Sequence, residues 1–174
     1  MVTVLFFTQN DAPALARSLV PLVHDAVEGH IAEVIVVDAG STDSTADIAD
    51  ASGCTLVQAA DRPLKETLAA ARAAWFVVLQ PGARLREGWH GAVMDHVMRP
   101  AAAAGRFRSH RRGNWFTRVF RPETGRRGPL ARGLVISRRQ ALANLPAGAR
   151  SGEDIVRGLA LTVIDAEIEM APKR

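Results

Sequence analysis

The stretch VIVVDAGSTDST, residues 34–45, is the part of the sequence best suited to bind a ligand. Four apolar residues lead directly into Asp38, and a glycine with several hydroxyl and carboxylate side chains follows. A carboxylate at the end of a buried strand can accept a hydrogen bond from a ligand, and the start of a following helix favours phosphate. The same residues can instead form an Asx turn onto the next helix, so both interpretations of Asp38 stay open.

A second acidic pair, Glu153–Asp154, lies near the end of the chain in the motif SGEDIVRGLA. A carboxylate within hydrogen-bond reach of a hydroxyl can act as a general base. The alternative is structural, because Ser151 followed three residues later by Asp154 is typical of a capping box. Acidic residues also suit the first turn of a helix. Arg157 is expected on the same helix face as Asp154.

The first hundred residues alternate between strand and helix patterns. Short β-branched and aromatic runs predict strands at 2–7, 32–38, 54–59 and 75–80. Helices are expected at 10–30, where Asn10 or Asp11 can cap and Pro21 should kink or end the helix, and at 44–53, 63–74 and 87–99. This alternation predicts an α/β protein with a mostly parallel central sheet and helices on both faces. Ligands bind such sheets beyond the strand carboxyl ends, where Asp38 and Gln80 fall.

The second half of the chain is less regular. Its patterns predict strands near 101–108, 133–139 and 162–168, with helices at 114–120, 139–145 and 152–161 and a turn at 81–85 before them. No internal repeat and no clean domain boundary is evident. We therefore expect one domain.

The composition is that of a folded protein, but its charge is uneven. Hydrophobic residues make up 48% of the 174 residues, and no apolar run approaches the roughly 18 residues of a membrane span. The lone Cys54 excludes an internal disulfide and suits a reducing compartment. With no signal-peptide pattern at the start, we expect a cytoplasmic protein, with peripheral membrane association as an alternative.

Residues 1–60 contain one basic side chain, Arg17, against eight acids, whereas residues 106–127 hold eight arginines against one acid. A basic segment of this kind favours a polyanionic partner, which is a diphosphate, an anionic membrane or a nucleic acid. A solvated loop is the structural alternative.

The order of these motifs resembles family 2 glycosyltransferases, which have the GT-A fold and use nucleotide-diphosphate sugars. The first strand ends in Thr8-Gln9-Asn10, and VVDAGSTDST is close to the family's VDDGSTDGT, with Ala39 in place of the second aspartate. The likeness covers residues 1–98 well and 132–162 loosely. It implies a single GT-A-like domain over 1–174, with a nucleotide-binding part at 1–98 and an acceptor-side part at 99–174 that carries the basic loop 106–127.

The resemblance also implies roles for individual residues. Asp154, with Glu153 beside it, would be the general base for an acceptor hydroxyl. The donor would be a UDP-sugar, and the acceptor is unidentified, with a lipid-linked acceptor as one alternative. The residues expected to bind the donor are Thr8, Asn10, Asp38, Gly40, Ser41 and Gln80.

The family's metal-binding Asp-x-Asp at the end of the fourth strand is degenerate here. The matching triplet is Gln80-Pro81-Gly82. Mg²⁺ and Mn²⁺ prefer carboxylate oxygens, so no metal-ligating residues are expected. Arginines of 106–127 are one alternative for neutralising the diphosphate, because guanidinium binds phosphate bidentately.

Three functional hypotheses follow. The first is a glycosyltransferase that moves a sugar to an acceptor hydroxyl. The second is a catalytically inactive homologue that acts as a binding or partner protein. The third, a nucleic-acid-binding module, rests on the basic segment alone and is the least favoured.

Overall fold

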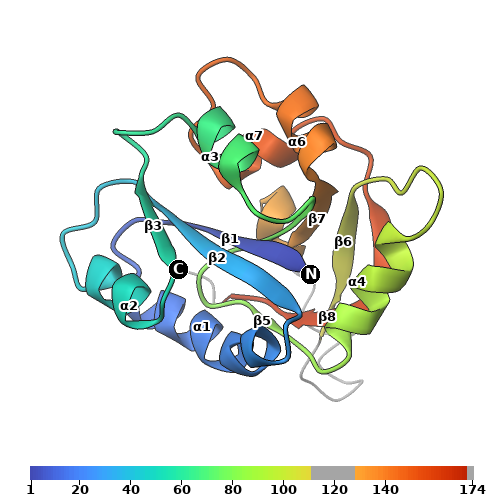
Figure 1. The fold of residues 1–174 in the computed structure, drawn as a ribbon, viewed down its shortest axis with the longest axis horizontal. Helices are drawn as coiled ribbons and strands as arrows, with labels where there is room; N and C mark the ends of the chain where they lie inside the picture. The colour runs from blue at the N-terminus through green and yellow to red at the C-terminus, as the bar shows by residue number, and fades with distance from the viewer. Residues whose placement is uncertain (111–127, 172–174) are drawn as a thin grey trace, which may run out of the picture.

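The computed structural model describes residues 1–110 and 128–171, and a mixed eight-stranded sheet runs through this part of the chain (Figure 1). The spatial order of the strands is β3 (Thr55–Gln58), β2 (Ile31–Asp38), β1 (Val2–Thr8), β4 (Trp75–Leu79), β7 (Leu134–Ser137), β6 (Gly105–Ser109), β8 (Thr162–Glu169) and β5 (Arg84–Leu85). Four pairings are parallel: β1–β2, β1–β4, β2–β3 and β6–β8. The pairs β4–β7, β6–β7 and β5–β8 are antiparallel.

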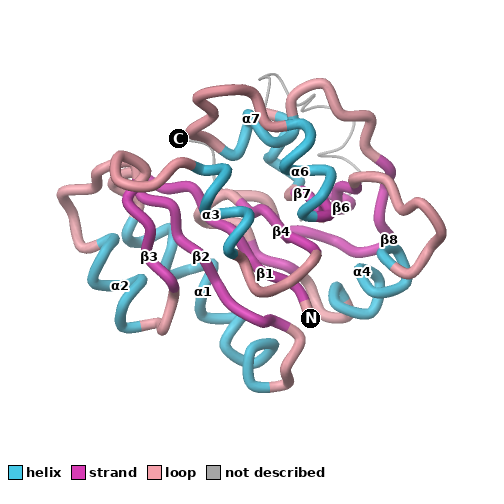
Figure 2. The backbone as a smooth tube through the Cα atoms, turned by 45° about the horizontal axis from the view of Figure 1, so that its top comes forward, coloured by secondary structure: helices cyan, strands magenta, loops and turns pink. Residues whose placement is uncertain are grey.

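Helices cover both faces of this sheet, as Figures 1 and 2 show. One face carries α1 (Ala12–Val27), α2 (Thr45–Ala51) and α4 (Trp89–Val97). The other carries α3 (Leu64–Ala70), α6 (Arg138–Asn144), α7 (Gly152–Val156) and the short 3₁₀ helix η1 (Pro129–Arg132). The predicted α/β class with helices on both faces is confirmed.

The central strands separate two hydrophobic clusters. Along β1, Val4 and Phe6 point to the cluster beneath α1, while Leu5 points to the cluster beneath α3 and α7. Successive side chains of a strand face opposite sides, and both sides of β1 are covered. This explains why its sequence is a continuous apolar run instead of an alternating one.

Several predicted boundaries were wrong. Helix α1 does not end at Pro21 but continues to Val27, since its buried face, which includes Leu19 and Leu22, holds the segment against the sheet despite the missing N–H. A kink at Pro21 stays a prediction. The helix expected to reach residue 161 ends at Val156, and Gly158 then adopts a left-handed φ of 76°.

Other differences concern short elements. The strand expected from residue 101 begins at Gly105. The expected turn at 81–85 ends in the two-residue strand β5, because residues 84 and 85 pair with the distant strand β8. The helix expected at 114–120 lies outside the described residues. None of the described helices is long and apolar enough to span a membrane.

Candidate functional site

Three polar residues lie side by side at the carboxyl ends of β1, β2 and β3. Thr8 pairs in register with Asp38, and Asp38 with Gln58. Residues opposite each other on parallel strands share a face of the sheet, and the Gln58 amide donates a hydrogen bond to Asp38 Oδ2 at 3.2 Å. The structure thus places Thr8 and Asp38, both expected to bind the donor, side by side at this edge.

Asp38 also forms the turn that its sequence predicts as an alternative. The backbone N–H of Ser41 lies 3.1 Å from each carboxylate oxygen, and the Ser41 hydroxyl donates to Oδ1. Gly40, in the turn, has a φ of 89°, which glycine adopts without strain. The Asp38 residue is only 1% exposed. Its carboxylate is therefore held by partners within the protein.

Asn10 fastens the β1–α1 loop to the β2–α2 loop. Its side-chain oxygen accepts a hydrogen bond from the backbone N–H of Thr42 at 2.8 Å, and its own N–H donates to the Ser41 hydroxyl at 2.9 Å. Asn10 has a left-handed φ of 52°, which asparagine tolerates better than most residues. The structure therefore brings together Asn10, Asp38, Gly40 and Ser41.

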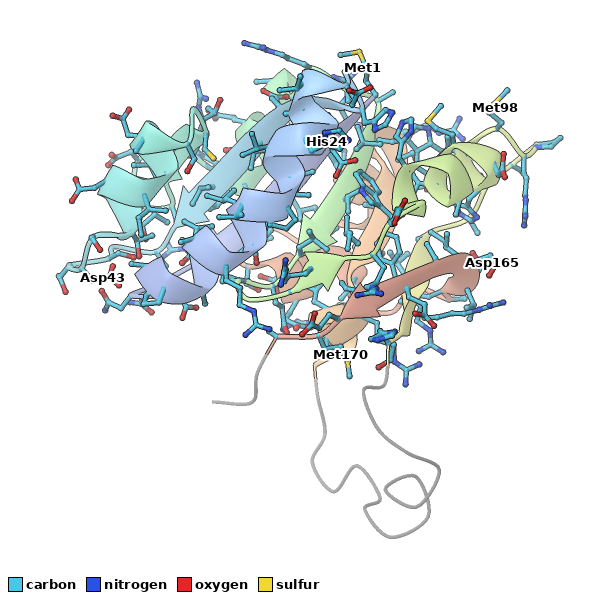
Figure 3. The ribbon with its side chains drawn as sticks, turned by 90° about the horizontal axis from the view of Figure 1, so that it is seen from below. Met1, His24, Asp43, Met98, Asp165 and Met170 are labelled. Carbon is cyan, nitrogen blue, oxygen red and sulfur yellow. The ribbon has the colours of Figure 1, made fainter. Side chains whose placement is uncertain are left out.

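Helix α1 is capped by a residue from the neighbouring loop. Asp11 occupies the N-cap position but its side chain makes no capping hydrogen bond. Instead, the Asp43 carboxylate accepts from the backbone N–H of Ala12 at 3.1 Å and from the hydroxyl and N–H of Thr45. Figure 3 shows Asp43 beside the start of α1. The Thr45 hydroxyl bond is the main cause of a lowered Asp43 pKa.

A cavity of about 200 Å³ opens on the α3 and α7 side of this edge. It lies beside Val37, between the β3–α3 loop and the loop before α7. The residues that line it are Val37, Ala59, Ala60, Arg62, Pro63, Leu64, Gly148, Ala149 and Arg150. Its volume is below the roughly 300–1,000 Å³ of typical ligand pockets, so it suits one part of a larger ligand.

Sequence reasoning missed Arg62 and Arg150, the two charged residues of this cavity. Neither forms an ion pair within the described residues. One available signal was that Arg62 follows the carboxyl end of a predicted strand, where ligands bind in such sheets. Arg150 directly precedes the Ser151 capping motif.

Asp154 holds the start of α7. Its Oδ2 accepts from the backbone N–H groups of Arg150 and Ser151, each at 3.1 Å, and from the Ser151 hydroxyl at 2.9 Å. Its Oδ1 pairs with Arg157 at 3.1 Å. The bond from the Arg150 N–H is the largest of the effects that lower the pKa of Asp154. The capping box considered in the sequence is therefore formed.

Glu153 has a different environment. Burial raises the pKa of its carboxyl group, against a backbone hydrogen bond from Leu130 that lowers it. Gly128 packs so closely that a methyl group there would overlap Glu153 Oε1. Glu153 Oε2 is buried without a hydrogen-bond partner among the described residues. Neighbouring Gly152 packs against Phe7 of β1, which ties α7 to the carboxyl edge of the sheet.

Thr8 provides a second orphaned oxygen at this edge. Its residue is 5% exposed, and its hydroxyl has no hydrogen-bond partner in the described part of the chain. Buried polar atoms are normally hydrogen-bonded, and an exception can mark a functional role. Thr8 is therefore a stronger donor-binding candidate than its sequence alone indicates.

Gln80 lies at the end of β4 in a turn that is satisfied from within. Its backbone oxygen accepts from Ala83 N. The Ser18 hydroxyl of α1 accepts from Gly82 N and donates to Ala83 O, both at 2.8 Å. Among the described residues no group of three or more His, Cys, Asp or Glu side chains could hold a metal ion. One neutral amide oxygen does not fit Mg²⁺ or Mn²⁺, which require several oxygen ligands.

Comparison with known proteins gives structural likeness only. No protein-family model and no curated protein sequence matches the chain. The fold is similar to glucosyl-3-phosphoglycerate synthase from Mycobacterium tuberculosis in complex with phosphoglyceric acid, with a TM-score of 0.64 and 21% identity over 100% of this chain and 72% of that chain. The complex of that synthase with Mn²⁺, UDP-glucose and phosphoglyceric acid gives 0.63 and 22%, with the same coverage.

A further solved structure, described as a mycobacterial protein, gives a TM-score of 0.62 at 22% identity and covers 100% of this chain and 68% of that one. These likenesses establish a GT-A-like fold. The predicted fold class is thereby confirmed a second time.

Proposed function

We propose that this protein binds a nucleotide-diphosphate sugar at the carboxyl edge of its sheet and transfers the sugar to an acceptor hydroxyl. The observation that carries the proposal is the cavity between residues 59–64 and 148–150, which is lined by Val37, the residue before Asp38, and by Arg62 and Arg150. Neither arginine forms an ion pair within the described residues. Likeness to a fold solved with UDP and UDP-glucose supports this choice of ligand.

The nucleoside would lie over the ends of β1 and β2. Thr8 offers a buried hydroxyl without a hydrogen-bond partner among the described residues, and Asn10 and Asp38 hold the adjoining loops in place. In this arrangement Asp38 acts mainly by fixing Ser41 and Gln58, since those groups already occupy its carboxylate. We therefore propose that Thr8 contacts the donor, and that Asn10, Asp38, Gly40 and Ser41 position the loop. Gln80 lies in a separate turn after β4.

The diphosphate would be neutralised by arginine without a metal ion. Guanidinium groups bind phosphate bidentately, and Arg62 and Arg150 approach the cavity from its two sides. The sequence pointed instead to the segment 106–127. There, Arg108 pairs with Asp165 at 2.7 Å, and residues 111–127 lie outside the described residues.

The catalytic base would come from the Glu153–Asp154 pair. In a direct displacement, the acceptor oxygen attacks the anomeric carbon, the bond to the diphosphate breaks, and a carboxylate takes the hydroxyl proton. A base with a raised pKa accepts a proton more readily. Glu153 has that raised pKa, and its Oε2 has no hydrogen-bond partner among the described residues. We therefore propose Glu153 as the base, with Asp154 fixing the helix start.

A second candidate, an inactive homologue that binds the nucleotide without turnover, is favoured by one observation. The Asp154 carboxylate, which the resemblance assigns as base, is committed to the capping box and to Arg157. Binding of UDP-glucose without sugar transfer to any acceptor would support this candidate over the first.

Calorimetric titration with UDP-glucose, with Mn²⁺ and then with EDTA, tests the proposal. We expect equal affinity under both conditions, loss of binding in Thr8→Val, and weaker binding in Arg62→Ala. Arg86→Ala, an exposed arginine on the β5–α4 loop, is the matched control and should bind normally. No binding of any UDP-sugar by the unmodified chain would overturn the proposal. A transfer assay with phosphoglyceric acid then separates an enzyme from a binding protein.

A further inference from the structure

A second and larger cavity lies at the opposite edge of the sheet. Its volume is about 490 Å³. It opens where β4 begins and β7 ends, between the residues that follow α4 and the start of α6. The residues that line it are Ala74, Trp75, Val97, Arg99, Ala101, Ala102, Ser137, Arg138, Arg139 and Gln140. Since β4 is 5 residues long, this edge lies roughly 15 Å from Gln80.

The charged side chains that line this cavity are all positive. Arg99, Arg138 and Arg139 line it, and no acidic side chain does. The ion pairs within the described residues involve other arginines, so these three guanidinium groups have no carboxylate partner there. Asp95 of α4 lies four residues before Arg99, which follows the helix, and the two side chains are not within ion-pair distance. The cavity is thus an uncompensated cationic site.

Arg138 is held in place by the surrounding chain. Its Nη1 donates to the carbonyl oxygen of Ala71 at 2.7 Å, and its backbone N–H donates to Ala74 O at 2.8 Å. The Gln140 amide donates to Ala102 O at 3.1 Å, which fixes the opposite wall. A guanidinium that is already positioned loses less entropy when it binds an anion.

The start of helix α6 does not supply the binding groups. Ser137 and Gln140 form a capping box in which the Ser137 hydroxyl accepts from the Gln140 N–H. With that end capped from within, an anion must be held by the arginine side chains. The half-buried Trp75 and the alanines of the wall offer apolar surface for the rest of a ligand.

We infer that this cavity binds a small phosphorylated molecule, with its phosphate held by Arg138 and by the exposed Arg99 and Arg139. Guanidinium groups recognise phosphate through paired N–H donors. A volume of about 490 Å³ lies within the range of small-molecule pockets. This site is separate from the nucleotide site proposed above and does not depend on that proposal.

Calorimetry with inorganic pyrophosphate and with glucose 6-phosphate tests the inference. The titrations use the Arg62→Ala/Arg150→Ala variant, so that the carboxyl-edge cavity does not contribute. We expect this variant to bind each phosphate compound at one site. Adding Arg99→Ala and Arg139→Ala should weaken the affinity for both compounds by about tenfold or more. Both of these arginines are exposed, so their removal should leave folding intact. Addition of the control Arg86→Ala should leave the affinity unchanged.

Two results would overturn the inference. The first is pyrophosphate affinity that does not change when Arg99 and Arg139 are replaced. The second is binding only to phosphatidylserine vesicles or to a single-stranded oligonucleotide, with no binding of either small phosphate compound. Phosphate on a lipid headgroup or a nucleic acid would then be the source of the recognised charge. Arg138→Ala, which also removes the contact to Ala71, serves as a second variant and should weaken pyrophosphate binding further.

Discussion

The two ends of the central strands use their charged side chains in opposite ways. At the carboxyl end, Asp38, Asp43 and Asp154 each accept hydrogen bonds from backbone N–H groups and hold loops or helix starts together. At the other end, Arg99 and Arg139 line a cavity and form no ion pair with any described carboxylate. Charged groups that are already satisfied build the scaffold. The groups proposed to bind ligands are the ones that have no such partner among the described residues.

Figure 3 makes the separation visible. Asp43, in the loop after β2, and Met98, the residue before Arg99, lie at opposite ends of the molecule. Among the described residues at the carboxyl end, the Thr8 hydroxyl and one Glu153 oxygen have no hydrogen-bond partner, and the two cavity arginines form no ion pair. Substitutions at the two ends should therefore separate scaffold residues from binding residues.

The largest expected effect is on a scaffold residue. Asp38→Ala should lower the free energy of unfolding by about 3 kcal/mol, because it leaves the Ser41 N–H and the Gln58 amide without their acceptor in a buried site. Urea denaturation followed by circular dichroism measures this change. The exposed Asp50→Ala on α2 is the control, with a change within about 0.5 kcal/mol. Equal effects of the two substitutions would contradict a scaffold role for Asp38.

The next largest effect concerns the binding residues. Arg150→Ala should weaken UDP binding about tenfold, or about 1.4 kcal/mol, since it removes one of the two cationic groups of the carboxyl-edge cavity. Its pyrophosphate binding at the opposite edge should persist. Arg99→Ala should show the reverse pattern. Calorimetry on both variants measures the two affinities, and a common loss in either variant would mean that the two edges are not independent sites.

A smaller effect is expected for the cap of α7. Asp154→Asn should cost about 1 kcal/mol of stability at pH 7, the usual value of an N-terminal cap interaction. The pKa of Asp154 is lowered in the folded protein, mainly by the Arg150 N–H. Its contribution is therefore present above the ordinary carboxyl pKa and is lost as the pH falls through the folded-state pKa. Unfolding measured between pH 2 and pH 7 should show the two proteins converging at the acidic end.

The smallest expected effect is a gain in stability, on replacing Glu153. Glu153→Gln should raise the melting temperature by about 1–2 °C at pH 8, because burial penalises the charged carboxylate. A raised folded-state pKa means that the penalty is absent below the ordinary carboxyl pKa and appears as the pH rises through the folded-state value. Scanning fluorimetry at pH 4 and pH 8 measures this. If the variant is less stable than the parent at pH 8, burial of the charged Glu153 carboxylate does not destabilise the fold.

The sequence predicts structure well where it depends on residues that are close together along the chain. The apolar runs of β1, β2 and β4 mark buried strands, and the capping box of Ser151 and Asp154 forms as its spacing indicates. The turn of Asp38 onto Ser41 is likewise local. In each case the interacting groups are only a few residues apart, so spacing alone carries the information.

Features that combine distant segments of the chain could not be predicted from the spacing of residues in the sequence. Asp43 caps α1 across 31 residues, where the sequence suggested Asn10 or Asp11. Arg62 and Arg150 meet at one cavity only because the sheet brings their loops together. The same holds for Glu153, whose orphaned oxygen depends on how η1 packs against α7. Long-range packing decides which polar groups remain free, and the site depends on these groups.

Hydrogen–deuterium exchange with and without UDP tests the central claim most directly, that the nucleotide binds at the carboxyl edge. We expect added protection at residues 38–42, 59–64 and 148–153, and unchanged exchange at 97–102 and 137–140. Protection confined to the second group of segments, or no protection anywhere at saturating UDP, would contradict it.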